Sequence, residues 1–360
     1  MRITIIHDWL KNIGGAERVL IELHKLFPDV PIYTLFYDKD FIQKWLPDAD
    51  IRPSFLQKIP LIAKLYWLFA WLMPTAIESF DLSEFDKVLS SSAIFSKGLI
   101  LKPSAKHICY CYSPTRFLWD RSHESGIMNQ ESWPKEFLKH FLRLWDRAAA
   151  DRVDQFVAIS KTVQDRIKKY YRRNSIIIYP PIKELKIETF IVNRKLKIKN
   201  YYLIVSRLYK YKNIDIAIEA FNKLNYSLVI IGAGPDKERL KRMAGKNITF
   251  LGEQDDSTLA QYYDACRAFI MPQEEDFGLT PIEAMSFGKP VVALRRGGAL
   301  ETVIEGQTGE FFDDPIPEAL ADAVRRLNEN YTNYNTETIK ARANLFNLER
   351  FKKEITQLII

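Results

Sequence analysis

The same local pattern opens both halves of this chain: a short apolar strand, a turn and then a helix. In the first half the strand covers Arg2 to Ile6, the turn holds Gly14-Gly15, and the helix starts at Ala16. In the second half a strand from Tyr201 to Val205 leads through a loop to a helix from Ile214 to Leu224. Strands and helices that alternate in this way form parallel sheets covered by helices on both faces.

Consecutive prolines mark the point where the pattern restarts. Regular structure ends at Tyr179-Pro180-Pro181, and the following stretch, Lys183 to Asn200, is lysine-rich and has no clear period. A chain of 360 residues is long enough for two domains of about 150 residues each. We therefore predict one domain over residues 1–182, a second over 183–340, and a C-terminal helix over 341–360 that could cross back to the first domain.

Further strands follow in each half, separated by turns and helical patterns. The expected strands are Lys87–Ser90, Ile108–Tyr112, Gln155–Ile159, Ser227–Gly232, Thr249–Leu251, Ala268–Met271 and Pro290–Ala293, with a helix from about Pro134 to Ala150. Ligands of such sheets bind beyond the carboxyl ends of the strands. The sequence therefore predicts an α/β fold in which two Rossmann-like domains leave a central cleft between them.

The net charge and the cysteines indicate which ligands the protein can bind and in which cellular compartment it works. A net charge of +7 favours anionic ligands such as nucleotide diphosphates or lipid head groups, and no nucleic-acid-binding motif is present. The three cysteines, Cys109, Cys111 and Cys266, lack the spacing of a metal or redox site, which predicts buried packing. The chain opens without the pattern of a signal peptide, so we expect a cytoplasmic protein at the inner face of the cell membrane.

The most informative stretch runs from Pro272 to Ala293 and reads as an acidic loop, a glycine, a helix and a strand. Gly278 permits a close backbone approach, and a helix that begins at Leu279 and Thr280 offers N–H groups to an anion.

Two glutamates belong to this stretch, Glu275 in the loop and Glu283 one turn into the helix. One carboxylate could hold sugar hydroxyls and the other a ribose diol, because a carboxylate accepts several hydrogen bonds. The alternative interpretation is a surface acid in the loop and a helix acid that favours the dipole.

This stretch resembles the signature of the retaining family 4 glycosyltransferases, and especially the mannosyltransferases of bacterial O-antigen and capsule assembly. In that signature a glutamate, Phe-Gly and a second glutamate precede Gly-x-Pro-Val-Val-Ala. Three further motifs of that family occur in order: Arg207 and Lys212 after a strand, Gly232-Ala-Gly234-Pro235, and Phe250-Leu251-Gly252. The resemblance covers most of the second half and implies a GT-B fold and a metal-independent transfer of a sugar from a sugar nucleotide.

The resemblance also implies a role for each residue that matches. Glu275 would contact the donor sugar, Glu283 the ribose, and Arg207 with Lys212 the diphosphate. Fixed cations suit a diphosphate leaving group, because its oxygens gain negative charge in the transition state. The alternative is that both cations are solvated side chains of a basic loop, since Lys210 stands beside them.

Two glycine pairs resemble further donor-side loops of the family. Gly14-Gly15 feeds a helix N-terminus, which can cradle a phosphate, although a tight turn would explain it equally well. Gly297-Gly298 resembles the later glycine loop of the family, with a plain turn as the alternative.

The segment after the strand at Ile108 departs from the family pattern, because Tyr112 stands where close relatives usually have a histidine. A tyrosine is a poor base near neutral pH, so we assign no general base here. Tyr112, Arg116 and Asp120 are expected to line the acceptor side. His107 lies at the start of the strand and is left out of the predicted site.

Residues Leu56 to Pro74 form a very apolar segment. Between Pro60 and Pro74 the only charge is Lys64, and the stretch is shorter than the ~20 residues that span a bilayer. Trp67 and Trp71 would share one face of a helix. We interpret this segment as an interfacial helix that contacts the membrane, with an apolar core helix as the alternative.

The sequence thus predicts a retaining hexosyltransferase that moves mannose from GDP-mannose to a glycan or lipid-linked acceptor in surface polysaccharide synthesis. It would need no metal or other cofactor. The alternatives are another GT-B enzyme, such as a sugar-nucleotide epimerase, and a non-catalytic module that binds nucleotide sugars.

Overall fold

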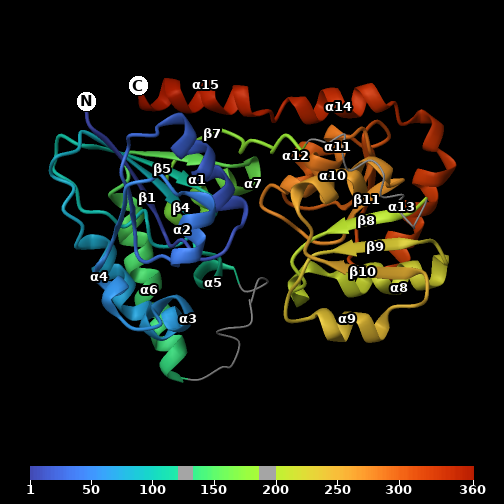
Figure 1. The fold of residues 1–360 in the computed structure, drawn as a ribbon, viewed down its shortest axis with the longest axis horizontal. Helices are drawn as coiled ribbons and strands as arrows, with labels where there is room; N and C mark the ends of the chain where they lie inside the picture. Colours follow the sequence, from blue (N-terminus) through green and yellow to red (C-terminus); the bar gives the residue numbers. More distant parts are fainter. Residues whose placement is uncertain (121–132, 186–199) are drawn as a thin grey trace. The chain divides into compact units, whose positions relative to one another are not determined.

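A computed structural model of the chain describes residues 1–120, 133–185 and 200–360. The chain divides into two compact units (Figure 1). The first unit comprises Met1–Pro180 together with Lys352–Ile360, and the second comprises Pro181–Phe351. Most of the predicted linker, residues 186–199, lies outside the described residues.

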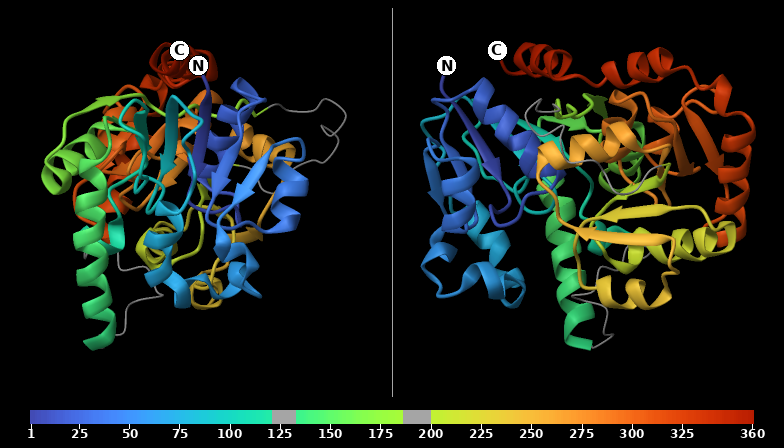
Figure 2. Two further views of the ribbon diagram at one scale, coloured as in Figure 1. Left: turned by 90° about the vertical axis from the view of Figure 1, so that its left-hand side faces the viewer. Right: turned by 45° about the vertical axis from the view of Figure 1, so that its right-hand side comes forward.

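The first unit contains a parallel sheet of seven strands in the order β3-β2-β1-β4-β5-β6-β7. Its strands are β1 (Ile3–His7), β2 (Ile32–Thr34), β3 (Ile51–Pro53), β4 (Lys87–Ser92), β5 (Lys106–Cys111), β6 (Gln155–Ala158) and β7 (Ser175–Ile177). Its principal helices are α1 (Gly15–Leu26), α2 (Lys39–Trp45), α4 (Met73–Glu78), α5 (Arg116–Trp119), α6 (Trp133–Asp151) and α7 (Lys161–Arg166) (Figure 2).

The second unit contains a parallel sheet of six strands in the order β10-β9-β8-β11-β12-β13. Its strands are β8 (Tyr202–Val205), β9 (Leu228–Ile231), β10 (Ile248–Gly252), β11 (Ala268–Met271), β12 (Val291–Leu294) and β13 (Gly309–Phe312). Its principal helices are α8 (Ile214–Leu224), α9 (Lys237–Met243), α10 (Asp256–Ala265), α11 (Leu279–Ser286), α12 (Ala299–Thr302), α13 (Pro317–Glu329) and α14 (Thr336–Asn344).

Both sheets have the strand order of the Rossmann fold, so the predicted α/β class with two Rossmann-like domains is confirmed. The order reverses between β1 and β4 in the first sheet and between β8 and β11 in the second. The loops after neighbouring strands diverge at such a reversal and open a crevice at the carboxyl edge. These two places are where each unit can best receive a ligand.

Two helical predictions differ from the structure. The C-terminal helix predicted over residues 341–360 corresponds to the end of α14 and to α15 (Leu348–Ile359), two helices that are separated by Leu345–Asn347. In the apolar segment the structure has three short helices instead of one: η1 (Phe55–Lys58), α3 (Ile62–Leu65) and η2 (Tyr66–Leu72). The segment is interrupted at Pro60 and at Leu61, whose φ of 57° is left-handed.

A buried ion pair joins several elements of the first unit. Lys97 Nζ lies 2.5 Å from Asp146 Oδ1, and both side chains are 1% exposed. The same carboxylate accepts hydrogen bonds from Thr115 Oγ1 at 2.7 Å, Trp119 Nε1 at 2.7 Å and the Tyr171 hydroxyl at 2.8 Å. Asp146 on α6 therefore anchors α5 and the end of the loop that precedes it.

Asp146→Ala should destabilise the protein by about 3–5 kcal/mol, because it leaves the Lys97 ammonium buried without its counter-charge. Urea denaturation followed by circular dichroism measures the change. The control is Asp151→Ala, at an exposed pair with Arg147, which should change stability by less than about 1 kcal/mol. Equal effects of the two substitutions would contradict the anchoring role of Asp146.

Candidate active site

In the second unit, the loops after β8 and β11 bring predicted site residues together at the strand-order reversal. Lys212 Nζ forms an ion pair with Glu275 Oε1. The side chains are 8% and 23% exposed, so the ammonium group is almost buried. Asn213 Nδ2 also donates to the carbonyl oxygen of Pro272 at 3.4 Å. The basic loop and the acidic loop thus meet at the edge where ligands of this sheet type bind.

The basic loop is held in place by the glycines that follow β9. A Cβ at Gly234 would lie 2.3 Å from the carbonyl oxygen of Leu208, and one at Gly232 would lie 2.0 Å from that of Ser206. The backbone N–H of Leu208 donates to the Ala233 oxygen at 2.9 Å. Only glycine permits this approach, so the Gly-x-Gly motif acts here by positioning the chain that carries Arg207 and Lys212.

The acidic loop is supported from behind by Gly297-Gly298. The N–H of Gly298 donates to the carbonyl oxygen of Glu275 at 2.8 Å. A Cβ at Gly298 would lie 2.3 Å from the Cα of Phe277, and one at Gly297 would lie 2.2 Å from the Glu275 oxygen. Of the two interpretations of this glycine pair, the structure favours the close backbone approach.

Gly278 joins the acidic loop to α11 and adopts a left-handed φ of 86°, which glycine tolerates better than other residues. Gly278 has no side chain that could cap α11. The first N–H groups of this helix, those of Leu279 and Thr280, are therefore suited to bind an anion. Glu283 lies inside α11, is 1% exposed and accepts a hydrogen bond from the Tyr263 hydroxyl at 2.9 Å.

Arg207 is exposed, and its Nη2 donates to the Tyr211 hydroxyl at 3.2 Å. Its guanidinium lies 5.7 Å from the centre of the Tyr209 ring, and the Lys212 ammonium lies 4.9 Å from that of Tyr211. The two predicted cations therefore differ, because Lys212 is fixed by its surroundings while Arg207 can reorient toward a ligand.

Gln273 is a site residue that the sequence did not predict. Its Nε2 donates to Glu275 Oε1 at 2.9 Å, which assigns the other end of the amide as the carbonyl oxygen. The side chain is 3% exposed, and that oxygen has no hydrogen-bond partner among the residues that the structure describes. Buried acceptors are normally satisfied, so Gln273 offers an acceptor beside Glu275.

In the first unit, Tyr112 directly follows β5 and belongs to a buried chain of hydrogen bonds. Its hydroxyl lies 3.1 Å from the carbonyl oxygen of Ala16 and 2.9 Å from Ser91 Oγ, which lies 3.0 Å from His7 Nδ1. Because a carbonyl only accepts, Tyr112 donates to Ala16 and accepts from Ser91, which in turn accepts from His7. Burial raises the pKa of Tyr112 far above its ordinary value, so the phenol stays protonated.

This chain of hydrogen bonds supports the start of α1, where Gly14-Gly15 lies. Gly14 precedes the helix in an extended conformation, and Glu17 in the first turn lies 3.6 Å from His7 Nε2. The structure thus connects Tyr112 to the glycine turn that the sequence assigned to the donor diphosphate. His7 and Ser91 could not be predicted as members, because nothing in their local sequence marks them.

Asp8, next to His7, fixes a neighbouring loop. Its two carboxylate oxygens accept hydrogen bonds from the backbone N–H groups of Ala93, Ile94, Phe95 and Ser96, at 2.7–2.8 Å. Four donors on one buried carboxylate tie the end of β1 to the end of β4.

Of the predicted acceptor-side residues, Arg116 is the first residue of the short helix α5 and Asp120 directly follows the helix. Asp120 forms an ion pair with Arg166 at 3.5 Å, and its N–H donates to the Arg116 carbonyl at 2.7 Å. His107 is buried in β5, where Ser90 Oγ lies 2.8 Å from its Nε2, and burial lowers its pKa to about 4.

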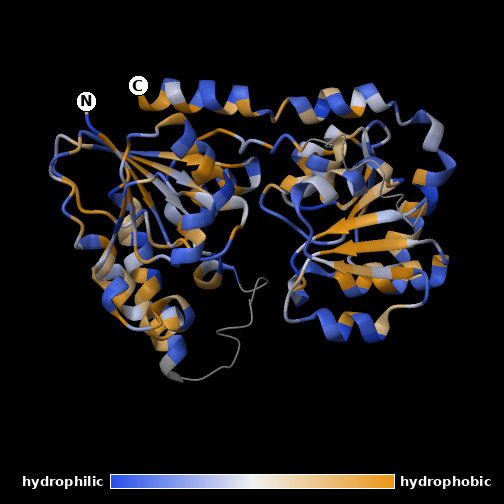
Figure 3. Ribbon diagram, in the orientation of Figure 1, coloured by the Kyte–Doolittle hydropathy of each residue, from blue (hydrophilic) through white to orange (hydrophobic). Residues whose placement is uncertain are grey.

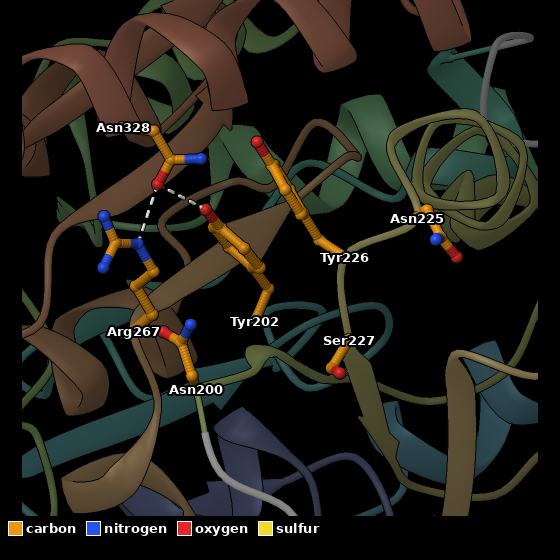
Figure 4. A pocket seen from close by; sticks show the side chains of 7 residues that line it. All are labelled: Asn200, Tyr202, Asn225, Tyr226, Ser227, Arg267 and Asn328. Atoms are coloured by element: carbon orange, nitrogen blue, oxygen red, sulfur yellow. Dashed lines mark hydrogen bonds between the residues drawn. The ribbon is translucent and has the colours of Figure 1, made fainter.

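A separate hollow of about 530 Å³ lies at the opposite edge of the second sheet (Figure 4). It is lined by residues at the amino ends of strands, among them Tyr202, Ser227 and Arg267. Asn328 Oδ1 accepts hydrogen bonds there from Tyr202 and Arg267, both at 2.7 Å. Ligands of parallel sheets bind at the carboxyl ends, and no predicted site residue lines this hollow.

Comparison with known proteins decides the family. A model of the family described as glycosyl transferases group 1 matches residues 185–344. An uncharacterized glycosyltransferase of Methanocaldococcus jannaschii is 30% identical over 353 residues, which cover 91% of this chain and 85% of that protein. The chain belongs to the group 1 glycosyltransferases.

Other relatives of this group 1 glycosyltransferase are more distant. The alpha-1,3/1,6-mannosyltransferase of Candida glabrata is 24% identical over 375 residues, 85% of this chain and 79% of that protein. HepE of Anabaena, solved in complex with UDP, is 19% identical with a TM-score of 0.73, and 99% of both chains are covered. Sucrose-phosphate synthase of Thermosynechococcus elongatus is 18% identical with a TM-score of 0.76, covering 99% and 98%. These likenesses confirm the GT-B fold.

Gln273→Leu should lower kcat/KM for the sugar nucleotide about ten- to a hundredfold, because a hydrogen bond to a charged group contributes about 1.5–3 kcal/mol. Steady-state kinetics with the nucleotide sugar measures the change. Gln164→Leu, at a glutamine of the first unit that donates to the Ser175 carbonyl at 2.7 Å, is the matched control. Unchanged kinetics for Gln273→Leu would exclude this residue from the site.

Proposed function

We propose that this group 1 glycosyltransferase transfers mannose from GDP-mannose to a glycan or lipid-linked acceptor of a surface polysaccharide, with retention of the anomeric configuration. The observation that carries the proposal is the buried Lys212 ammonium beside Glu275 at the strand-order reversal of the second unit. A fixed cation and a carboxylate at this position suit two neighbouring parts of a sugar nucleotide, its diphosphate and its sugar.

The proposed task of Lys212 and Arg207 is to stabilise the leaving diphosphate. When the bond from the anomeric carbon to the β-phosphate breaks, its electron pair goes to a phosphate oxygen. Lys212 provides a positive charge without reorganisation, because the glycine-packed loop already holds it in place. Arg207 can add a bidentate contact from the exposed side. The N–H groups of Leu279 and Thr280 add dipoles of the same sign.

The sugar would lie against the acidic loop. Glu275 accepts from Lys212 and Gln273, yet a carboxylate has capacity for about four hydrogen bonds and can also accept from sugar hydroxyls. The free oxygen of Gln273 adds a further acceptor. We assign the ribose to Glu283, and the acceptor side to Tyr112, Arg116 and Asp120, as the family resemblance implies.

Retention would follow from attack on the face that the diphosphate leaves. The acceptor oxygen forms its bond to the anomeric carbon there, and its proton goes to the departing phosphate oxygen. We assign no protein base, because the one candidate at the end of β5, Tyr112, holds its proton and donates it to Ala16. We also propose that the reaction needs no metal and takes place in the cytoplasm, where the free cysteines Cys109, Cys111 and Cys266 stay reduced.

The choice of mannose rests on relatives rather than on geometry. The 24% identical protein of Candida glabrata is named a mannosyltransferase, and the sequence motifs resemble those of mannosyltransferases. HepE was solved with UDP, so a uridine donor is the alternative that an experiment must separate.

Thermal unfolding with GDP, UDP, ADP and CDP, without metal, tests the donor. GDP at about a hundred times its Kd should stabilise the protein by about 2.7 kcal/mol, and Lys212→Ala should abolish the shift. Lys210→Ala, at the exposed lysine two residues earlier, is the control and should keep it. A shift with UDP alone would show that the donor is a UDP-sugar instead of GDP-mannose. No shift with any nucleotide would favour the non-catalytic binding module.

The kinetic prediction concerns turnover and stereochemistry. Lys212→Ala should lower kcat about 10²–10³-fold, because one group that stabilises developing charge contributes about 3–4 kcal/mol. NMR of the early product should show the anomeric configuration of the donor. A product of inverted configuration would overturn the proposed mechanism, and interconversion of the nucleotide sugar without an acceptor would indicate an epimerase.

A further inference from the structure

The exposed apolar side chains of this protein are unevenly distributed. In the part of the chain that the structure describes, 18 large hydrophobic residues are exposed, and nine of them lie in two short segments of the first unit. We call these nine the apolar surface: Phe55, Leu61, Leu65, Trp67, Leu68, Trp71, Phe137, Phe141 and Leu144. Concentrations of this kind mark interaction sites rather than chance exposure.

The first segment, residues 55–71, exposes one side and packs the other. Trp67 and Trp71 are 43% and 55% exposed, whereas Leu56 and Ile62 are at most 4% exposed and belong to the hydrophobic core. The segment is therefore anchored, and its tryptophans are presented outward from a fixed base. Tryptophan is the residue that prefers the boundary between apolar lipid and water.

The second segment is the outer face of α6. Phe137, Phe141 and Leu144 are 65%, 52% and 60% exposed, and their spacing of four and three residues places them on one side of the helix. Leu142 on the inner side is fully buried. It shares one core cluster with Leu56 and Ile62 of the first segment, so both segments cover the same core.

The figures place the two segments together. Figures 1 and 2 show α3 and α6 extending past the same end of the first sheet. Figure 3 shows that both carry strongly hydrophobic residues there.

Basic residues accompany the apolar surface. Lys58 and Lys64 are exposed, and no acidic residue occurs from residue 54 to residue 77. Along α6 the basic residues Lys135, Lys139, Arg143 and Arg147 outnumber the two exposed acids, Glu136 and Asp151, which pair with Lys139 and Arg147. Arg52, just before this segment, is paired with Asp50 at 2.8 Å and with Glu84 at 3.5 Å.

From this combination we propose that the apolar surface binds the face of a bilayer that contains anionic lipids. The tryptophans and the α6 stripe would enter the interface, and the lysines would contact the head groups. No helix among the described residues is long and apolar enough to cross a bilayer. The inference does not depend on which sugar is transferred, because it concerns a surface without predicted site residues.

Flotation with vesicles of phosphatidylcholine containing one third phosphatidylglycerol tests the proposal, with nucleotide-induced thermal shifts as the check on folding. Trp67→Ser/Trp71→Ser and Phe141→Ser/Leu144→Ser should each lower the partition coefficient at least about tenfold. Ile316→Ser/Leu345→Ser, at equally exposed apolar residues of the second unit, should leave it unchanged. Raising the salt concentration, or omitting the anionic lipid, should weaken binding.

Three results would overturn the proposal. Equal binding to pure phosphatidylcholine would remove the role of charge, and wild-type binding by the α6 variant would exclude α6 from the surface. The third result comes from sedimentation of the protein without lipid. If the wild type self-associates but does not float with vesicles, and if both double variants are monomeric, the apolar surface joins two copies of the chain.

Discussion

Parallel strand pairing forces all strands of a sheet to end at one edge, and this constraint organises the second unit. Because the strand order reverses between β8 and β11, the loops that follow these strands flank one crevice. One loop carries Lys212 and the other Glu275, and the two side chains form an ion pair there. Residues 63 positions apart in the chain are thus brought into contact by topology rather than by local sequence.

Close backbone packing at glycines fixes the positions of these two loops. Gly232 and Gly234 let the basic loop approach the chain after β9, and Gly297-Gly298 let a later loop support the acidic one. Each close approach would be blocked by a Cβ atom, because the atom in its way belongs to the backbone and cannot rotate aside. Lys212 and Glu275 therefore lie on loops whose backbones are fixed by close packing, as preorganised electrostatic stabilisation requires.

In the first unit, loops are held in place by buried polar side chains. Asp8 holds four backbone N–H groups of one loop, and Asp146 holds Lys97, Thr115 and Trp119. Such groups are costly to bury alone and stable when fully satisfied. Tyr112 belongs to this class, since its hydroxyl connects the end of β5 to the start of α1. The tyrosine hydroxyl thus helps to position the start of α1, through a contact with Ala16 that the sequence alone did not predict.

The sequence by itself determined the alternation of strands and helices, because apolar periodicity and turn residues are local signals. The predicted bounds of α8 and β11 agree with the structure to the residue, as does the start of α11 at Leu279. The sequence did not predict β2, β3, β7 and β13; the first three have only three residues, too few to show a period. Only the tertiary structure decided that Gln273 supports Glu275, that Tyr112 connects to Ala16, and that α6 exposes an apolar stripe. The Gln273–Glu275 contact depends on how the acidic loop folds, the Tyr112–Ala16 contact on the meeting of segments 96 residues apart, and the stripe on which helix face the core leaves uncovered.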